Sequence, residues 1–164
     1  RLFDEDISNW NVSNVTNMDH MFHGCENFNQ PLNNWNTSQV TNMESMFSET
    51  LSFNQLLNNW DVSNVKSMDF MFHDAINFNQ PLNNWNVSNV EDMTWMFKHT
   101  YDFNQPLNNW NVSSVKYMDG MFEDTWEFDQ SLNNWDVSSV INMKDIFKDA
   151  RSFDKNNALW YNFN

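Results

Sequence analysis

Positive charge, cysteine, glycine and proline are all scarce in this 164-residue sequence, which has eight Lys and Arg, one Cys, two Gly and three Pro. Because 22 acidic side chains outnumber the eight basic ones, the net charge is −14. No nucleic acid is therefore expected as a partner, since a phosphate backbone requires clustered Lys and Arg. A single cysteine cannot form an internal disulfide and favours neither redox compartment. Two glycines are too few for a Gly-rich phosphate-binding loop.

Long apolar runs are also missing from the sequence. No stretch approaches the roughly 20 apolar residues that cross a bilayer, so we expect no membrane insertion by this segment. The chain begins at Arg1, without an initiator Met or a secretion signal. We therefore expect a fragment of a longer protein, whose targeting signals would lie in the flanking sequence.

Tryptophan is the most regular feature of the sequence, and it recurs every 25 residues with no insertion or deletion. The series comprises Trp10, Trp35, Trp60, Trp85, Trp110, Trp135 and Trp160. A short fixed period is typical of a solenoid whose repeats contact mainly their neighbours. We predict one domain, with six tandem 25-residue repeats over residues 1–154 and a divergent last half-repeat or cap over residues 155–164.

Two hydrophobic periods follow one another within each repeat. The pattern L-x-x-W-x-V from Leu82 to Val87 alternates apolar with polar residues near its end, as a short half-buried strand does. The later pattern M-x-x-M-F-x-x-T from Met93 to Thr100 has the spacing of one helix face. Ser88 and its equivalents precede that spacing and are interpreted as helix caps. The predicted fold class is α/β, with one short parallel strand and one short helix per repeat.

The motif of the third full copy also resembles known repeats. Leu82, Trp85, Val87 and Val90 follow the framework of leucine-rich repeats. The longer motif F-N-Q-P-L-N-N-W-N-V-S-N-V-T-N-M-x-x-M-F resembles the 25-residue tandem repeat of bacterial surface proteins and mycoplasma lipoproteins, which is grouped with BspA-type leucine-rich repeats. The resemblance implies a leucine-rich-repeat-like solenoid, a cell-surface or secreted location, and adhesion to a protein or glycan ligand. It implies neither enzymatic activity nor a cofactor.

Most recurring polar residues have a structural interpretation. Asn84 and Asn86 have equivalents in the other repeats, with Asp at two of the latter positions, and we expect ladders of stacked side-chain amides. The functional alternative is a regular polar surface for an extended ligand such as a polysaccharide. Since each recurring Ser is interpreted as a cap, the sequence offers no catalytic residue.

Candidate metal ligands are dispersed along the sequence. Acidic residues share one repeat position, at Asp19, Glu44, Asp69 and Asp119. They lack the dense spacing of a calcium-binding loop, so a calcium-stabilised acidic solenoid stays an alternative. The four histidines fall in different phases or two repeats apart and lack the spacing of zinc ligands, and we predict no metal site.

Variable positions carry the best prediction of a binding site. Stacking explains the residues that recur, so recognition is expected where the repeats differ. Helical geometry predicts exposed aromatic side chains in the middle repeats. The predicted binding residues are Phe70, Ile76, Trp95, Tyr101, Tyr117 and Trp126. Partial burial between repeats, without a role in binding, is an alternative interpretation of this patch, and a purely structural spacer is the alternative function.

Overall fold

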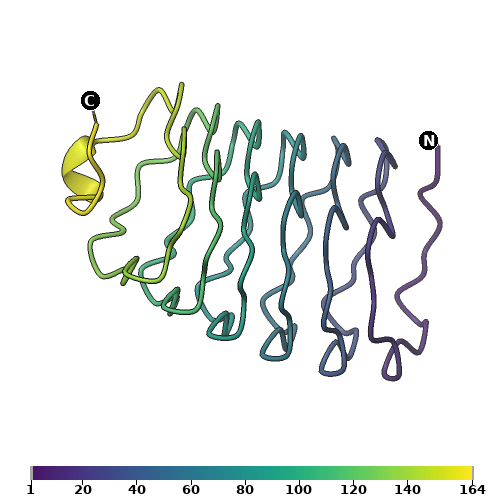
Figure 1. The fold of residues 1–164 in the computed structure, drawn as a ribbon. Helices are drawn as coiled ribbons and strands as arrows, with labels where there is room; N and C mark the ends of the chain where they lie inside the picture. Colours follow the sequence, from purple (N-terminus) through teal and green to yellow (C-terminus); the bar gives the residue numbers. More distant parts are fainter. Residues whose placement is uncertain (1, 164) are drawn as a thin grey trace.

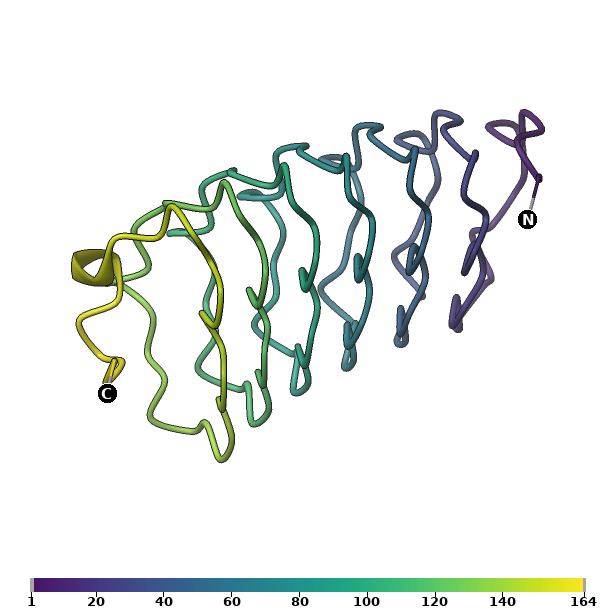
Figure 2. The ribbon, with the colours of Figure 1, turned by 90° about the horizontal axis from the view of Figure 1, so that it is seen from above.

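Successive 25-residue segments of the chain form coils that stack in the order of the sequence. The computed structural model describes residues 2–163. Arg1, the first residue of the predicted repeats, and Asn164, the last residue of the predicted cap, lie outside the described residues. Coils follow one another from the purple N-terminal end to the yellow C-terminal end (Figure 1). The view turned by 90° shows the same order, with the two termini at opposite ends of the stack (Figure 2).

Regular secondary structure is almost absent from these coils. Between residues 2 and 163 the only helical element is the 3-10 helix η1, Lys155–Asn157. Isolated parallel bridges join equivalent residues of successive coils: Asn17 to Asn42, Asn42 to Ser67, Ser67 to Asp92, Asp92 to Tyr117, and Tyr117 to Asn142. The predicted α/β, leucine-rich-repeat-like fold with a strand and a helix in every repeat is therefore wrong.

The predicted helix fails because its backbone N–H groups bond to the next coil. Met93, Trp95 and Phe97 donate to backbone carbonyls 24 residues later, over 2.8 to 3.0 Å. Met96 instead closes a turn by donating to the Met93 carbonyl at 3.2 Å. Trp95 and His99 have φ angles of 53° and 58°, in the left-handed region, which interrupts a right-handed helix. Consecutive turns therefore point Met93, Met96 and Phe97 inward, in the spacing that resembles a helix face.

The predicted strand is replaced by turns as well. Trp85 donates its backbone N–H to the Leu82 carbonyl at 3.0 Å, which closes a turn where the alternating pattern had indicated extended chain. Ser88 does not cap a helix. Its backbone N–H donates to Oδ1 of Asn86 at 3.2 Å, and its hydroxyl donates to the same oxygen at 2.7 Å, which is an Asx turn.

Aromatic columns form the core of the stack. Successive tryptophans from Trp35 to Trp160 lie 6.2 to 6.5 Å apart between ring centroids, with ring planes within 11° of parallel. A phenylalanine column from Phe22 to Phe147 has spacings of 5.5 to 5.8 Å. Each buried indole N–H needs an acceptor, and Trp85 donates to the Leu57 carbonyl of the preceding coil at 3.0 Å.

An amide ladder runs along the stack, but not at the predicted positions. Oδ1 of Asn79 accepts from the backbone N–H of Asn104 and from Nε2 of Gln105, both at 3.0 Å. The same bonds recur between neighbouring coils, one repeat position after a buried Phe. The predicted series at Asn86 makes Asx turns within its own coil instead.

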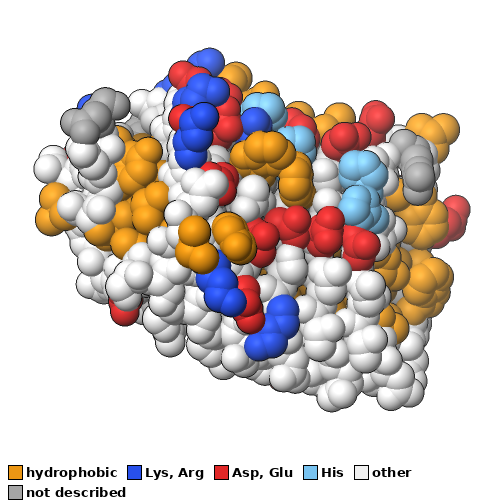
Figure 3. All heavy atoms as spheres, viewed as in Figure 1, with side chains coloured by type: hydrophobic (Ala, Val, Ile, Leu, Met, Phe, Trp, Pro, Cys, Tyr) orange, Lys and Arg blue, Asp and Glu red, His pale blue; other side chains and the backbone are white. Residues whose placement is uncertain are grey.

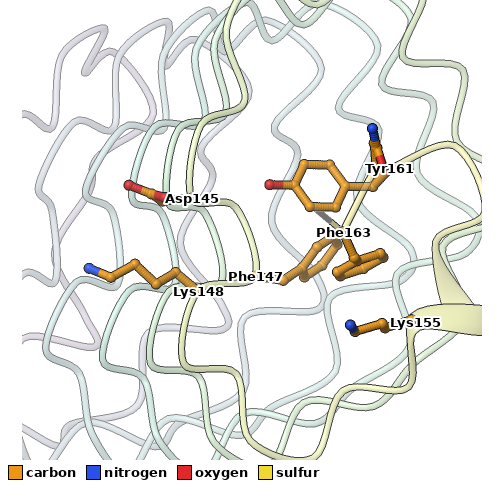
Figure 4. A pocket seen from close by; sticks show the side chains of 7 residues that line it. Asp145, Phe147, Lys148, Lys155, Tyr161 and Phe163 are labelled. Carbon is orange, nitrogen blue, oxygen red and sulfur yellow. The ribbon is translucent and has the colours of Figure 1, made fainter.

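The last residues pack against the final coil. Asp154 caps the N-terminus of η1, and its side chain accepts from the Asn156 backbone N–H at 2.8 Å. Tyr161 and Phe163 lie 5.5 and 5.6 Å from Phe147, measured between ring centroids. Figure 4 shows these three rings together beside a shallow hollow of about 300 Å³. No helix in the described part of the chain is long and apolar enough to span a membrane.

Candidate functional site

Phe70 and Trp95 occupy the same position in adjacent coils and pack together. Their rings meet edge to face, with centroids 4.7 Å apart and planes at 87°. Both residues have left-handed backbones, with φ angles of 55° and 53°, a conformation that costs a bulky residue roughly 1–2 kcal/mol. The other coils place His20, Ser45, Gly120 and Asp145 here. Both side chains are half-buried rather than fully exposed, because the helix that predicted their exposure does not form.

Gly120 leaves room for the Trp95 indole. A Cβ atom at Gly120 would lie 2.4 Å from Cδ1 of Trp95, well inside van der Waals contact. The indole of Trp95 therefore packs over the backbone of Gly120, which is the equivalent residue in the next coil. Gly120 is the only glycine at this repeat position, and its φ of 52° is also left-handed. Lys98 Nζ lies 4.9 Å from the indole centroid, within cation–π range. Trp95 is thus held between Phe70, Lys98 and the backbone of Gly120.

Tyr101 and Trp126 form a second aromatic pair, six residues after Trp95 and Gly120. The two rings stack with centroids 4.0 Å apart and planes at 18°. The guanidinium carbon of Arg151 lies 3.8 Å from the Trp126 ring, and the indole N–H donates to Oδ1 of Asp124 at 3.2 Å. Phe70, Trp95, Tyr101 and Trp126 are together called the aromatic cluster below.

Ile76 and Tyr117, the remaining predicted binding residues, lie outside these ring pairs. Ile76 is half-buried, and its carbonyl accepts from the Asp102 backbone N–H at 3.3 Å. Tyr117 is 41% exposed and follows Lys116, which pairs with Glu91 at 2.5 Å. Among the described residues, no ring contact joins Tyr117 to the aromatic cluster. Hydrophobic side chains accordingly appear in several separate groups on the face drawn in Figure 3.

Histidine and aspartate side chains gather between the two aromatic pairs. Oδ2 of Asp74 lies 3.2 Å from Nδ1 of His73, and Oδ1 of Asp74 lies 2.9 Å from Nδ1 of His99. On the other side of its ring, Nε2 of His99 lies 3.5 Å from Oδ2 of Asp124. All four side chains are partly buried, with 19 to 30% of each exposed. We call His73, Asp74, His99 and Asp124 the His–Asp cluster.

Burial lowers the pKa of His73, and the charges of His99 and Lys98 act in the same direction while Asp74 opposes them. Sequence spacing did not indicate this cluster, because His73 and His99 stand in different repeat phases. The two repeat phases differ by only one residue, so stacking of the coils brings both histidine rings to Asp74. The centroids of the His73 and His99 rings are 5.6 Å apart.

A buried carboxylate stands beside the aromatic cluster. Glu123 is 7% exposed and contacts Lys98 at 3.1 Å and Lys148 at 2.8 Å. Burial alone would raise the pKa of Glu123, but hydrogen bonds to the two lysines prevail and lower it. Lys98 is therefore fixed between Glu123 and the Trp95 ring.

Acidic side chains in a row cross the same face of the molecule (Figure 3). The pKa of Glu44 is raised by burial and by the charges of Asp69 and Asp19. The pKa of Asp69 is raised by burial and by Asp92, against a hydrogen bond from Ser67. In the part of the chain that the structure describes, two groups of side chains bring atoms together that could bind a metal ion. One is His73, Asp74 and His99 of the His–Asp cluster, and the other lies near one end of the acidic row and consists of Glu44 with the exposed Asp19 and His20.

Comparison with known proteins places the chain in a repeat family. No curated protein matches it. The family described as "Mycoplasma protein of unknown function, DUF285" matches residues 1–105 and, in an overlapping second match, residues 80–163. This agrees with the predicted resemblance to mycoplasma tandem repeats, whereas the leucine-rich-repeat part of that prediction has no support in the coils. The chain therefore belongs to the Mycoplasma DUF285 family.

Proposed function

We propose that this chain is a non-enzymatic repeat module of a surface or secreted protein, and that it binds a protein or glycan partner through the aromatic cluster. One observation supports the proposal most directly. Four aromatic side chains that break the repeat lie in adjacent coils and pair with one another, at 4.7 and 4.0 Å. Stacking of the coils does not require them, since other coils place Ser45, Glu26 or Asp145 at the same positions.

The energetics of the pairs favour a role in recognition. Strained backbones persist where the surrounding structure fixes them, and they concentrate at functional sites. The left-handed conformation of Phe70 and Trp95 is shared by this repeat position in the other coils and so belongs to the repeat. The two bulky rings are nevertheless the distinctive feature, since Asn, Asp or Gly would adopt this conformation at lower cost. Trp and Tyr are also the residues that most often dominate binding energy at interfaces. A rigid aromatic pair loses little side-chain entropy when a partner covers it.

Basic side chains around the aromatic cluster suggest how a partner would be selected. Lys98 lies against Trp95 and Arg151 lies against Trp126, in a chain that has only eight Lys and Arg. Negative side chains border the rings as well, since Lys98 pairs with Glu123 at 3.1 Å and Trp126 donates to Asp124. This combination suits a partner that covers the rings with apolar groups and offers polar groups of both charges at their edges.

A binding screen with matched variants tests the proposal. The labelled chain would be applied to a glycan array and to a panel of extracellular proteins, and hits would be titrated. Phe70→Ser and Trp95→Ser copy the residue that the array already carries at Ser45, so the coils should still stack. We expect each change to weaken the best hit about tenfold, or roughly 1.4 kcal/mol.

His20→Ser is the control, since it makes the same change at the same repeat position outside the aromatic cluster. It should leave the affinity unchanged. A hit that binds the Phe70→Ser, Trp95→Ser double variant as tightly as the unaltered chain would exclude the aromatic cluster as its site.

A structural spacer is the alternative function, and the continuous stack of backbone hydrogen bonds from coil to coil favours it. A spacer would give no saturable hit in the screen. The calcium-stabilised alternative draws support from Glu44 and Asp69, whose pKa values are raised by burial and, to a smaller extent, by neighbouring carboxylates. It requires that millimolar calcium raises the melting temperature.

A further inference from the structure

We propose that the His–Asp cluster is a binding site for a zinc-class divalent cation, held by Nδ1 of His73, a carboxylate oxygen of Asp74 and Nδ1 of His99. One ligand atom from each of the three residues lies within 4.8 Å of the other two. Imidazole nitrogens and a carboxylate oxygen are ligands that zinc prefers. Three protein ligands leave the fourth tetrahedral position for water.

The ligand atoms of the cluster lie near the spacing that tetrahedral coordination requires. Ligands at the zinc bond length of 2.0–2.1 Å lie about 3.3 Å from one another in a tetrahedron. Oδ2 of Asp74 lies 3.2 Å from Nδ1 of His73, and Oδ1 of Asp74 lies 2.9 Å from Nδ1 of His99. The two imidazoles thus approach different oxygens of one carboxylate, and side-chain rotation would have to bring the ligand atoms from within 4.8 Å of one another to the tetrahedral spacing. Nδ1 of His73 also faces the Ser48 hydroxyl at 3.5 Å, which a bound cation would displace.

Asp124 supplies the outer carboxylate that zinc-binding histidines commonly have. If Nδ1 of His99 binds the cation, Nε2 carries the proton and faces Oδ2 of Asp124 at 3.5 Å. Such a carboxylate fixes the ring orientation and strengthens the ligand. Asp124 is itself oriented by the Trp126 indole N–H, which donates to its other oxygen at 3.2 Å. The two nitrogens of the His99 ring thus have different roles, since Nδ1 binds the cation and Nε2 faces Asp124.

The charges around the cluster favour a cation at this place. Asp74 and Asp124 flank the site, and Glu49 contributes a further negative field at His73. The nearest positive charge, Lys98, is engaged by Glu123 at 3.1 Å. The linear spacing of the histidines predicts no metal site, but this spacing does not include neighbours one coil away.

Isothermal titration of the metal-stripped chain with zinc chloride tests the site, on protein without a histidine tag. We expect one equivalent of zinc to bind, with calcium and magnesium at least 100-fold weaker. His99→Asn and Asp74→Asn should each weaken zinc at least tenfold, and Asn tolerates the left-handed backbone at both positions. Asp124→Asn should weaken it about 10–100-fold.

His20→Asn is the matched control, at the second, more exposed group of ligand atoms, and should leave the affinity of the tight site unchanged. Absence of saturable zinc binding, calcium binding as tight as zinc, or unchanged affinity in His99→Asn would each overturn the proposal. If a variant fails to fold, the zinc titration of the unaltered chain still tests the proposal, and so does the following chemical modification. Zinc should protect His73 and His99, but not His20, from carbethoxylation measured by peptide mass, and equal protection of all three would also overturn it.

Discussion

Replacing Trp85 by alanine should unfold the middle of the stack. Trp85 is 3% exposed and lies between Trp60 and Trp110. Its ring centroid is 6.5 Å from the ring centroid of each neighbour. Removing a buried Trp side chain costs about 3–5 kcal/mol through lost burial and the cavity that remains. The two parallel ring contacts add about 0.5–1.5 kcal/mol each. The Leu57 carbonyl loses the indole N–H but keeps the Trp60 backbone N–H as a donor at 3.1 Å, so this lost hydrogen bond adds only about 0.5–1.5 kcal/mol.

These contributions overlap, because truncation removes the same contacts that the cavity term counts. We therefore expect the free energy of unfolding to fall by about 5 kcal/mol, a large part of the 5–15 kcal/mol that holds a typical domain together. Since coils contact mainly their neighbours, the loss should also divide the stack. Urea unfolding should then show two transitions, one for each side of the altered coil.

Near-ultraviolet circular dichroism is the suitable probe, because it reports on the stacked rings directly. Two controls separate the causes. Trp85→Phe keeps a ring in the column but loses the indole hydrogen bond and part of the buried ring area, and should cost about 1–3 kcal/mol. Trp10→Ala makes the same truncation at a side chain that is 55% exposed, and should cost less than about 1.5 kcal/mol. If Trp85→Ala and Trp10→Ala differ by less than about 1 kcal/mol, the column does not carry the stability assigned to it.

Two further predictions concern positions beside the candidate site. Gly120→Ala should cost about 2–4 kcal/mol, through the clash with Trp95 and the left-handed backbone. In a Trp95→Ser background the same change should cost only about 1–2 kcal/mol, and equal costs in urea titrations of both backgrounds would contradict the packing of Trp95 on Gly120. Asp69→Asn should raise the melting temperature at pH 7, because the raised pKa of Asp69 means that its charged form destabilises the folded chain. This gain should shrink as pH falls through the raised pKa and vanish below the ordinary pKa of 3.8; a gain that is constant with pH, or a loss at pH 7, would refute the electrostatic reasoning.

Burial along the chain followed closely from the sequence. The Trp period aligned the repeats, and the residues expected in the core of the third copy, including Trp85, Met93 and Phe97, are at most 3% exposed. Apolar residues at fixed phases must face inward when the phases are stacked, whatever the backbone between them does. Phase also singled out the aromatic residues that depart from the repeat, and four of them do pair in space.

The candidate metal ligands were not predictable in this way. His73 and His99 are 26 residues apart and occupy different phases, so their spacing matched no ligand motif. A 25-residue coil brings residues that differ by one phase into contact across the stack. Left-handed backbones at Asp74 and His99 then aim both side chains at the same place, and no local signal in the sequence indicates that conformation for a histidine.

By itself the sequence determined the period, the alignment of the copies and the side chains that the stack buries, because hydrophobicity is a property of each residue. Only the tertiary structure decided the backbone. An apolar spacing of i, i+3, i+4 and i+7 fits a helix and also fits successive turns. The two differ in where the N–H groups find carbonyls, and here Met93, Trp95 and Phe97 find them in the next coil. These hydrogen-bond partners depend on where the neighbouring coil lies, and a local sequence pattern does not specify that position.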